Sequence, residues 1–205
     1  MNIRNLITFA FLFFSLSLVA QKKTLPSAPK EKAIVKRKDF KPMNISNRLN
    51  EYPFNAAVKV RIVSFNLDYD GELVITPIGS TEANEKELPV NLSNIVGRND
   101  LPGFAQSKML TLIEVTKLTD ILYNVCPKYI ISSYTKLGCY EPRNAILFYD
   151  KNDQVFQYIE ICFECKENET KPKKLNILDN FCSYGYDKLK TFFKENGIRT
   201  ETLKK

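Results

Sequence analysis

The chain has 205 residues, a formal net charge of +7 and no histidine. The absence of histidine excludes Ser-His-Asp and Cys-His catalytic centres, histidine-ligated metals and histidine proton shuttles. The sequence also lacks a glycine-rich phosphate loop and a G-x-S-x-G nucleophile elbow. A non-enzymatic protein without a cofactor is therefore the expectation.

Residues 1–20 have the three parts of a secretory signal peptide. Arg4 precedes an apolar run from Leu6 to Val19, and the small residue Ala20 follows. The run is shorter than the roughly twenty apolar residues that a transmembrane helix needs. We therefore predict cleavage after Ala20 and a mature chain that does not span a membrane and resides in the periplasm or outside the cell.

The positive charge is concentrated in residues 21–42, because basic and acidic residues are equal in number from residue 42 to the C-terminus. The segment contains prolines and few apolar residues, so we expect a flexible linker. It could make weak contact with an anionic surface such as phospholipid or lipopolysaccharide, or it could be a solvated leader. The rest of the chain has no basic helix or RNA-binding motif, so no nucleic-acid partner is expected.

Residues 43–199 are expected to form one α+β domain, followed by a frayed tail at 200–205. Alternating apolar and polar residues predict a strand at 56–65. A turn signal and a second β-rich run at 72–78 follow, which predicts a hairpin. A long, polar, turn-rich connection is expected at 79–107.

Two helices and a second hairpin are expected in the C-terminal half. Thr111 and Glu114 have the spacing of a capping box, and apolar residues recur at helical spacing as far as Cys126. The predicted elements are a helix at 112–126, strands at 144–149 and 154–163, an edge strand at 175–178 and a helix at 184–196. The expected fold is an antiparallel α+β fold, with a sheet built from two hairpins and two main helices.

The five cysteines all lie beyond residue 125. An oxidising export compartment favours disulfides among Cys139, Cys162, Cys165 and Cys182. Four cysteines allow three pairings, and the sequence does not choose between them. Cys126 continues the apolar stripe of the predicted helix, so we expect it to be the odd, buried thiol.

Two other roles of these cysteines, disulfide exchange and metal binding, are compatible with the sequence. The C-F-E-C motif of Cys162 and Cys165 could exchange with substrate disulfides, although the polar residues after it do not predict the helix that would activate a thiol. Alternatively, Cys139, Cys162, Cys165 and Cys182 could hold a metal ion as four thiolates, although zinc sites of this kind usually contain two close cysteine pairs.

The predicted strand at 154–163 has one apolar face and one mixed face. Alternation places Ile159 on the apolar face and Glu160 and Cys162 on the other. Together with Glu141 and Arg143 from the preceding loop, Glu160 could line a polar pocket for a small ligand. The alternative is that Glu141 and Arg143 form an ion pair that only fixes the loop.

The motifs G-C-Y-E-P-R, E-I-C-F-E-C and F-C, followed by F-F-K-E-N-G-I, resemble small uncharacterised exported proteins of Bacteroidetes-type bacteria. The resemblance spans about Cys139 to Ile198 and includes the L-V-A-Q ending of the signal region. It implies export, and it brings no activity, ligand or functional residue. The expected function is that of an exported, non-enzymatic domain, stabilised by disulfides, that binds a partner at the envelope.

Overall fold

The computed structural model describes residues 35–67, 89–90, 92–99, 104–130, 140–179 and 181–201. The predicted signal peptide, the strand at 72–78 and Cys139 lie outside these residues. The elements, in chain order, are β1 (Val35–Lys36), α2 (Ile45–Asn50), η1 (Phe54–Ala56), β2 (Lys59–Ser64), β3 (Asn66–Leu67), β4 (Pro89–Val90), η3 (Leu92–Asn94), β5 (Gln106–Met109), α3 (Leu112–Asp120), η4 (Ile121–Val125), η5 (Cys126–Lys128), β6 (Tyr129–Ile130), β7 (Asn144–Tyr149), β8 (Val155–Cys162), β9 (Glu167–Lys171), η6 (Asn176–Leu178) and α4 (Ser183–Glu195).

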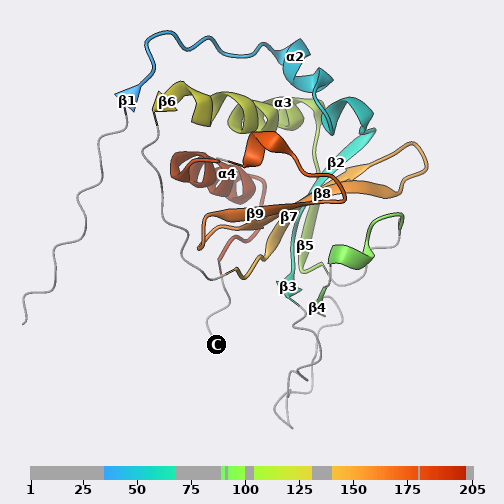
Figure 1. Ribbon diagram of the computed structural model, residues 1–205. Helices are drawn as coiled ribbons and strands as arrows, with labels where there is room; N and C mark the ends of the chain where they lie inside the picture. Colours follow the sequence, from blue (N-terminus) through green and yellow to red (C-terminus); the bar gives the residue numbers. More distant parts are fainter. Residues whose placement is uncertain are drawn as a thin grey trace, which may run out of the picture. The chain divides into compact units, whose positions relative to one another are not determined.

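The centre of the domain is a five-stranded antiparallel sheet in the order β5-β2-β7-β8-β9 (Figure 1). β7 and β8 form the second predicted hairpin. Its turn is stabilised by Asp150, whose Oδ1 accepts the backbone N–H groups of Asn152 and Gln154, both at 2.9 Å. The sheet and its two main helices confirm the predicted α+β class.

The strand partners are given by the structure. β2 lies between β5 and β7, which pair with its two edges over Arg61–Ser64. The edge strand is the polar β9, whereas 176–178 forms the 3-10 helix η6. Alternation identifies a strand but not its partner, and an edge strand can be held by backbone hydrogen bonds without apolar side chains.

The two main helices begin and end near the expected residues. At the start of α3, the Thr111 hydroxyl accepts the Glu114 N–H at 3.3 Å and the Glu114 carboxylate accepts the Thr111 N–H at 2.8 Å, which confirms the capping box. α3 continues through a π-helical turn, η4, into η5. α4 ends at Glu195, and the φ of 76° at Gly197, just beyond the C-cap Asn196, suits glycine. None of the helices in the described part of the chain is long and apolar enough to cross a membrane.

α3 and α4 pack on one face of the sheet and enclose the larger apolar cluster (Figure 1). Its fully buried members include Ile62, Leu118, Ile146, Ile159 and Phe193. Each large apolar side chain buried in this way stabilises the fold by about 1.5–3 kcal/mol. The opposite face carries a smaller cluster, with Val63, Phe65, Leu147 and Tyr158 from the sheet region and Leu92 and Ile95 from the segment around η3.

The ends of the domain extend further than composition suggested. β1 pairs with β6 through Val35 and Lys36, and the Arg37 N–H donates to the Lys128 carbonyl at 2.9 Å. Residues 35–37 of the predicted linker at 21–42 are therefore held by backbone hydrogen bonds, which need no apolar side chains. Thr200, in the predicted tail at 200–205, is 3% exposed.

Candidate functional site

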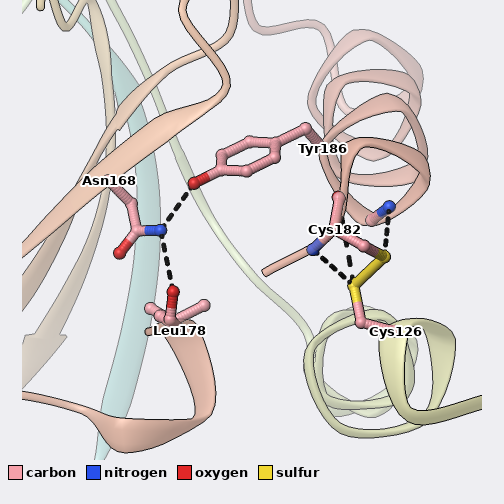
Figure 2. Close-up of a disulfide and its surroundings, with 6 residues drawn as sticks. Cys126, Asn168, Leu178, Cys182 and Tyr186 are labelled. Carbon is pink, nitrogen blue, oxygen red and sulfur yellow. Dashed lines mark hydrogen bonds between the residues drawn. A yellow bond between two sulfur atoms is a disulfide. The ribbon is translucent and has the colours of Figure 1, made fainter. Parts of the chain in front are cut away.

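A buried disulfide joins Cys126 to Cys182 within the helical layer (Figure 2). The two Cα atoms are 5.5 Å apart, a normal distance for a disulfide, and the cysteines are 56 residues apart in the sequence. Cys126 opens η5, and Cys182 is the N-cap of α4, where its sulfur accepts the Gly185 N–H at 3.3 Å. The bond therefore fixes the end of the α3–η4–η5 helical run to the start of α4.

The pairing corrects the expectation for Cys126. We predicted an odd buried thiol there, and the side chain is indeed only 7% exposed. Burial in an apolar stripe does not exclude a bridge, however, because the stripe packs against the segment that carries Cys182. Cys182 is thus confirmed as a disulfide cysteine, with a partner that the sequence did not indicate. Cys139 lies outside the described residues.

Gly185 makes room for this bridge. A Cβ atom at Gly185 would lie 2.5 Å from the Cys126 sulfur and 2.7 Å from the ring of Phe181. Any larger residue would therefore displace the disulfide or the ring. Glycine inside a helix lowers helix stability by about 1 kcal/mol relative to alanine. Its presence in S-Y-G-Y is therefore a sequence signal that could have indicated a close contact at this point.

The same region holds the edge strand against α4. The Asn168 side-chain amide, on β9, donates to the Tyr186 hydroxyl at 2.6 Å and to the Leu178 carbonyl at 3.3 Å (Figure 2). Tyr186 belongs to α4 and Leu178 to η6. The sheet, η6 and α4 are thus joined by polar contacts beside the disulfide.

The C-F-E-C motif forms the turn between β8 and β9. Cys162 ends β8, is 1% exposed, and its sulfur accepts the Cys165 N–H at 3.3 Å. The Cys162 thiol is free, so it is not bonded to Cys165. Disulfide exchange requires that an attacking thiol reach its substrate. The burial of Cys162, and of Cys165 at 3% exposure, therefore opposes the exchange interpretation.

The proposed four-thiolate metal site does not fit the structure. Cys182 is bonded to Cys126, so it is not available as a thiolate ligand while the disulfide is intact. Across the described ranges of the chain, no three cysteine, aspartate or glutamate side chains are grouped in a way that could hold a metal ion.

The residues of the predicted polar pocket have separate partners. Arg143 approaches Glu141 at 3.5 Å, as in the loop-fixing interpretation. Glu160 accepts a hydrogen bond from the Tyr140 hydroxyl at 3.3 Å. Burial raises the pKa of Glu160, the hydrogen bond from Tyr140 lowers it, and the charge of Glu169, opposite it on β9, raises it further.

A recess of about 400 Å³ is lined by residues from both disulfide-linked segments. One wall contains Lys128 and Tyr129, just after Cys126, and another contains Tyr184 and Lys188 of α4, the helix that Cys182 caps. β1 and the segment after it contribute Lys36 and Phe40. We call this feature the basic recess, and the disulfide holds two of its walls together.

Aromatic rings and lysines are interleaved in the basic recess. The rings of Tyr129 and Tyr184 meet edge to face with their centroids 5.3 Å apart. The Lys128 ammonium lies 5.8 Å from the centre of the Tyr129 ring, and the Lys188 ammonium lies 5.2 Å from that of Tyr184. In such cation–π contacts the lysine remains charged while it lies over the ring.

The lining acid of the recess, Asp120, is already engaged. Its Oδ1 lies 3.3 Å from Arg48 Nη1 and accepts the Asn124 side-chain amide at 2.7 Å. The recess is therefore positively charged. These residues form no local pattern in the sequence, because Lys36, Lys128 and Lys188 are far apart in the chain and only the fold brings them together.

Comparison of the chain with protein-family models, with curated proteins and with solved structures finds no match. Function is therefore inferred from the chemistry of the disulfide and of the basic recess.

Proposed function

We propose that this chain is an exported, non-enzymatic domain that is stabilised by disulfide bonding and binds a ligand or partner in the periplasm or outside the cell. The observation that supports it best is the buried Cys126–Cys182 bond between two walls of the basic recess. Structural disulfides persist in oxidising compartments and are rare in the cytosol. The signal peptide predicted at 1–20 agrees with that location.

The recess supports binding over catalysis. It presents fixed positive charge and aromatic surface, and the carboxylate among its described lining residues, Asp120, is held by Arg48. The chain has no histidine to transfer protons near neutral pH. A concave site with a few polar groups on an aromatic wall is typical of ligand pockets.

Cell fractionation and mass spectrometry test export and disulfide formation in one experiment. The chain is produced in a bacterium from its own first residue, the cells are fractionated, and the intact mass is measured with and without thiol labelling. We expect a chain that begins at Gln21, outside the cytoplasm, whose digest contains a peptide linking Cys126 to Cys182. The same digest identifies the state of Cys139.

The control variant is Phe13→Arg, which places a charge inside the predicted signal sequence. This variant should remain in the cytoplasm, uncleaved and with labelled thiols. An unmodified chain that also stays uncleaved, cytoplasmic and fully thiol-reactive would contradict the proposal.

A further inference from the structure

We propose that the basic recess binds the phosphate group of an organic phosphate, whose apolar body lies against the tyrosine rings. The inference deepens the proposed binding function and rests on it. Its starting observation is the convergence of Lys36, Lys128 and Lys188 with Tyr129 and Tyr184 around one recess.

The first step concerns charge. Among the residues that the structure describes, no carboxylate lies within 4.0 Å of the ammonium groups of Lys36, Lys128 or Lys188. The lining acid, Asp120, is offset by Arg48. A recess lined by uncompensated charge of one sign concentrates ions of the opposite sign. The ligand of the recess is therefore an anion.

The second step concerns the type of anion. An organic phosphate carries a charge of about −1.5 to −2 and three acceptor oxygens, which suits three ammonium groups that each act as a point charge. The planar fork of arginine binds carboxylate and phosphate alike, whereas lysine binds phosphate as a point charge. The described lining of the recess contributes lysines and no arginine. Several ammonium groups favour phosphate over a carboxylate, because phosphate carries the larger negative charge.

The third step concerns the rest of the ligand. Phe40, Tyr129 and Tyr184 give the recess an aromatic wall beside the ammonium groups. Its volume of about 400 Å³ lies in the lower part of the range for small-molecule pockets, about 300–1,000 Å³. This space exceeds what a bare phosphate ion fills, so the ligand has an apolar or aromatic body.

The disulfide prepares the recess for binding. Lys128 and Tyr184 each lie two residues after a cysteine of the Cys126–Cys182 bond. A cross-link at this point limits the freedom of both walls before the ligand arrives, which reduces the ordering cost of binding. The oxidised protein should therefore bind more tightly than the reduced one.

The phosphate could belong to a free metabolite or to a lipid headgroup. Arg37, Lys38 and Lys41 are exposed in the same segment as Lys36. Basic side chains near an anionic bilayer strengthen membrane attachment. The two sources share the same phosphate chemistry and are separated by experiment.

The test uses the oxidised chain as the cell exports it. Phenyl phosphate is titrated calorimetrically as the free organic phosphate, with phenol as the uncharged control. Vesicles of phosphatidylcholine with phosphatidic acid are the lipid probe, with pure phosphatidylcholine vesicles as their control. We expect binding of at least one phosphate probe and of neither control.

Two variants separate the recess from general positive charge. Lys128→Gln/Lys188→Gln removes two ammonium groups from the recess. Lys173→Gln is the matched control, because its ammonium also lies over a tyrosine ring, 5.0 Å from the centre of Tyr52, but does not line the recess. We expect at least about tenfold weaker binding for the double variant, since two charge-assisted contacts to the phosphate are lost. The control should bind as the unmodified chain does.

The outcomes are distinct. Lysine-dependent binding of phenyl phosphate assigns a free organic phosphate, and lysine-dependent binding of phosphatidic acid vesicles alone assigns a lipid headgroup. Binding of neither probe, or equal weakening by Lys173→Gln, would overturn the inference. If the chain is cleaved and oxidised in those preparations, the proposed export stands and only the ligand assignment fails. A chain that is uncleaved and reduced fails the proposed function before any ligand is added.

Discussion

The helix-covered face of the sheet is apolar and cross-linked, whereas the opposite face contains a buried carboxylate. On the helical side, the Cys126–Cys182 bond lies within the larger apolar cluster. On the other side, Glu160 is 9% exposed and bonded to Tyr140. The two faces therefore respond to different conditions: the thiol redox state acts on the helical layer, and ionisation of the buried Glu160 acts on the opposite face.

This division follows from what each face packs against. α3 and α4 bring apolar stripes and a glycine that lets Cys126 approach α4 closely. The other face is covered by shorter segments and keeps polar side chains within its buried area, among them Glu160. Burial makes the charged form of Glu160 costly, and the hydrogen bond from Tyr140 and the charge of Lys171 offset only part of that cost, so that face is sensitive to pH.

The largest expected effect is the loss of the cross-link. Cys126→Ala/Cys182→Ala should lower the free energy of unfolding by about 4 kcal/mol, because the bond closes a loop between cysteines 56 residues apart. Urea unfolding with and without reductant measures it. The unmodified chain in reductant should approach the stability of the variant.

Cys162→Ala is the matched control on the other side of the sheet. It removes a buried thiol that forms no disulfide. Its unfolding midpoint should still fall when reductant is added, by as much as that of the unmodified chain. If the reductant had no effect on either protein, the Cys126–Cys182 bond would not contribute to stability and the comparison of the two faces would be wrong.

The next effect tests the packing around the bond. Gly185→Ala should destabilise the protein by about 1–3 kcal/mol, because the new methyl group overlaps the Cys126 sulfur and the Phe181 ring. In the Cys126→Ala/Cys182→Ala background the loss should be smaller, since one of the two overlaps is removed. A double-mutant cycle with urea unfolding gives the coupling. Equal losses in both backgrounds would place the clash on Phe181 alone.

On the opposite face, Glu160→Gln should change the pH dependence of stability. Burial raises the pKa of Glu160 above its ordinary value of 4.5. As pH rises from 4, the unfolded carboxyl ionises first, so the unmodified chain loses stability until the folded pKa is passed. The glutamine keeps the acceptor for Tyr140 and does not ionise, so its stability relative to the unmodified chain should be higher at pH 8 than at pH 4, by up to about 1 kcal/mol.

Glu169→Gln is the control for that experiment. Glu169 lies directly opposite Glu160 on β9, and its side chain is 49% exposed. Its replacement removes the neighbouring charge that raises the pKa of Glu160 but leaves Glu160 buried, so the pH dependence of stability should change less than in Glu160→Gln. A larger change for Glu169→Gln would mean that repulsion between the two carboxylates, and not burial, controls Glu160.

The smallest effect concerns the cap of α3. A hydrogen bond from Lys108, followed by the Thr111 N–H, lowers the pKa of Glu114 to about 2. The charged form therefore stabilises the fold above pH 4.5, and this contribution is lost as pH falls toward 2. Glu114→Gln should cost about 0.5 kcal/mol at pH 7, allowing for solvent screening. The difference between this variant and the unmodified chain should be smaller at pH 3. Glu195→Gln, at an exposed position of α4, is the control and should change stability little at pH 7 and at pH 3.

Local pattern was enough to predict many of the elements. The capping box of Thr111 and Glu114, the hairpin of β7 and β8 and the helix that ends before Gly197 all depend on interactions between residues close in the chain. Alternation also placed Ile159 and Glu160 on the correct faces of β8. These features follow from helical and strand periodicity, which a sequence displays directly.

The tertiary structure decided which distant residues meet. It paired Cys126 with Cys182, placed β5 and β7 on the two edges of β2, and made the polar β9 the edge strand. It also gathered Lys36, Lys128 and Lys188 around the basic recess. Periodicity says which side of an element is buried, but the choice of partner depends on how whole faces pack, so the disulfide and the candidate site emerge only in the folded chain.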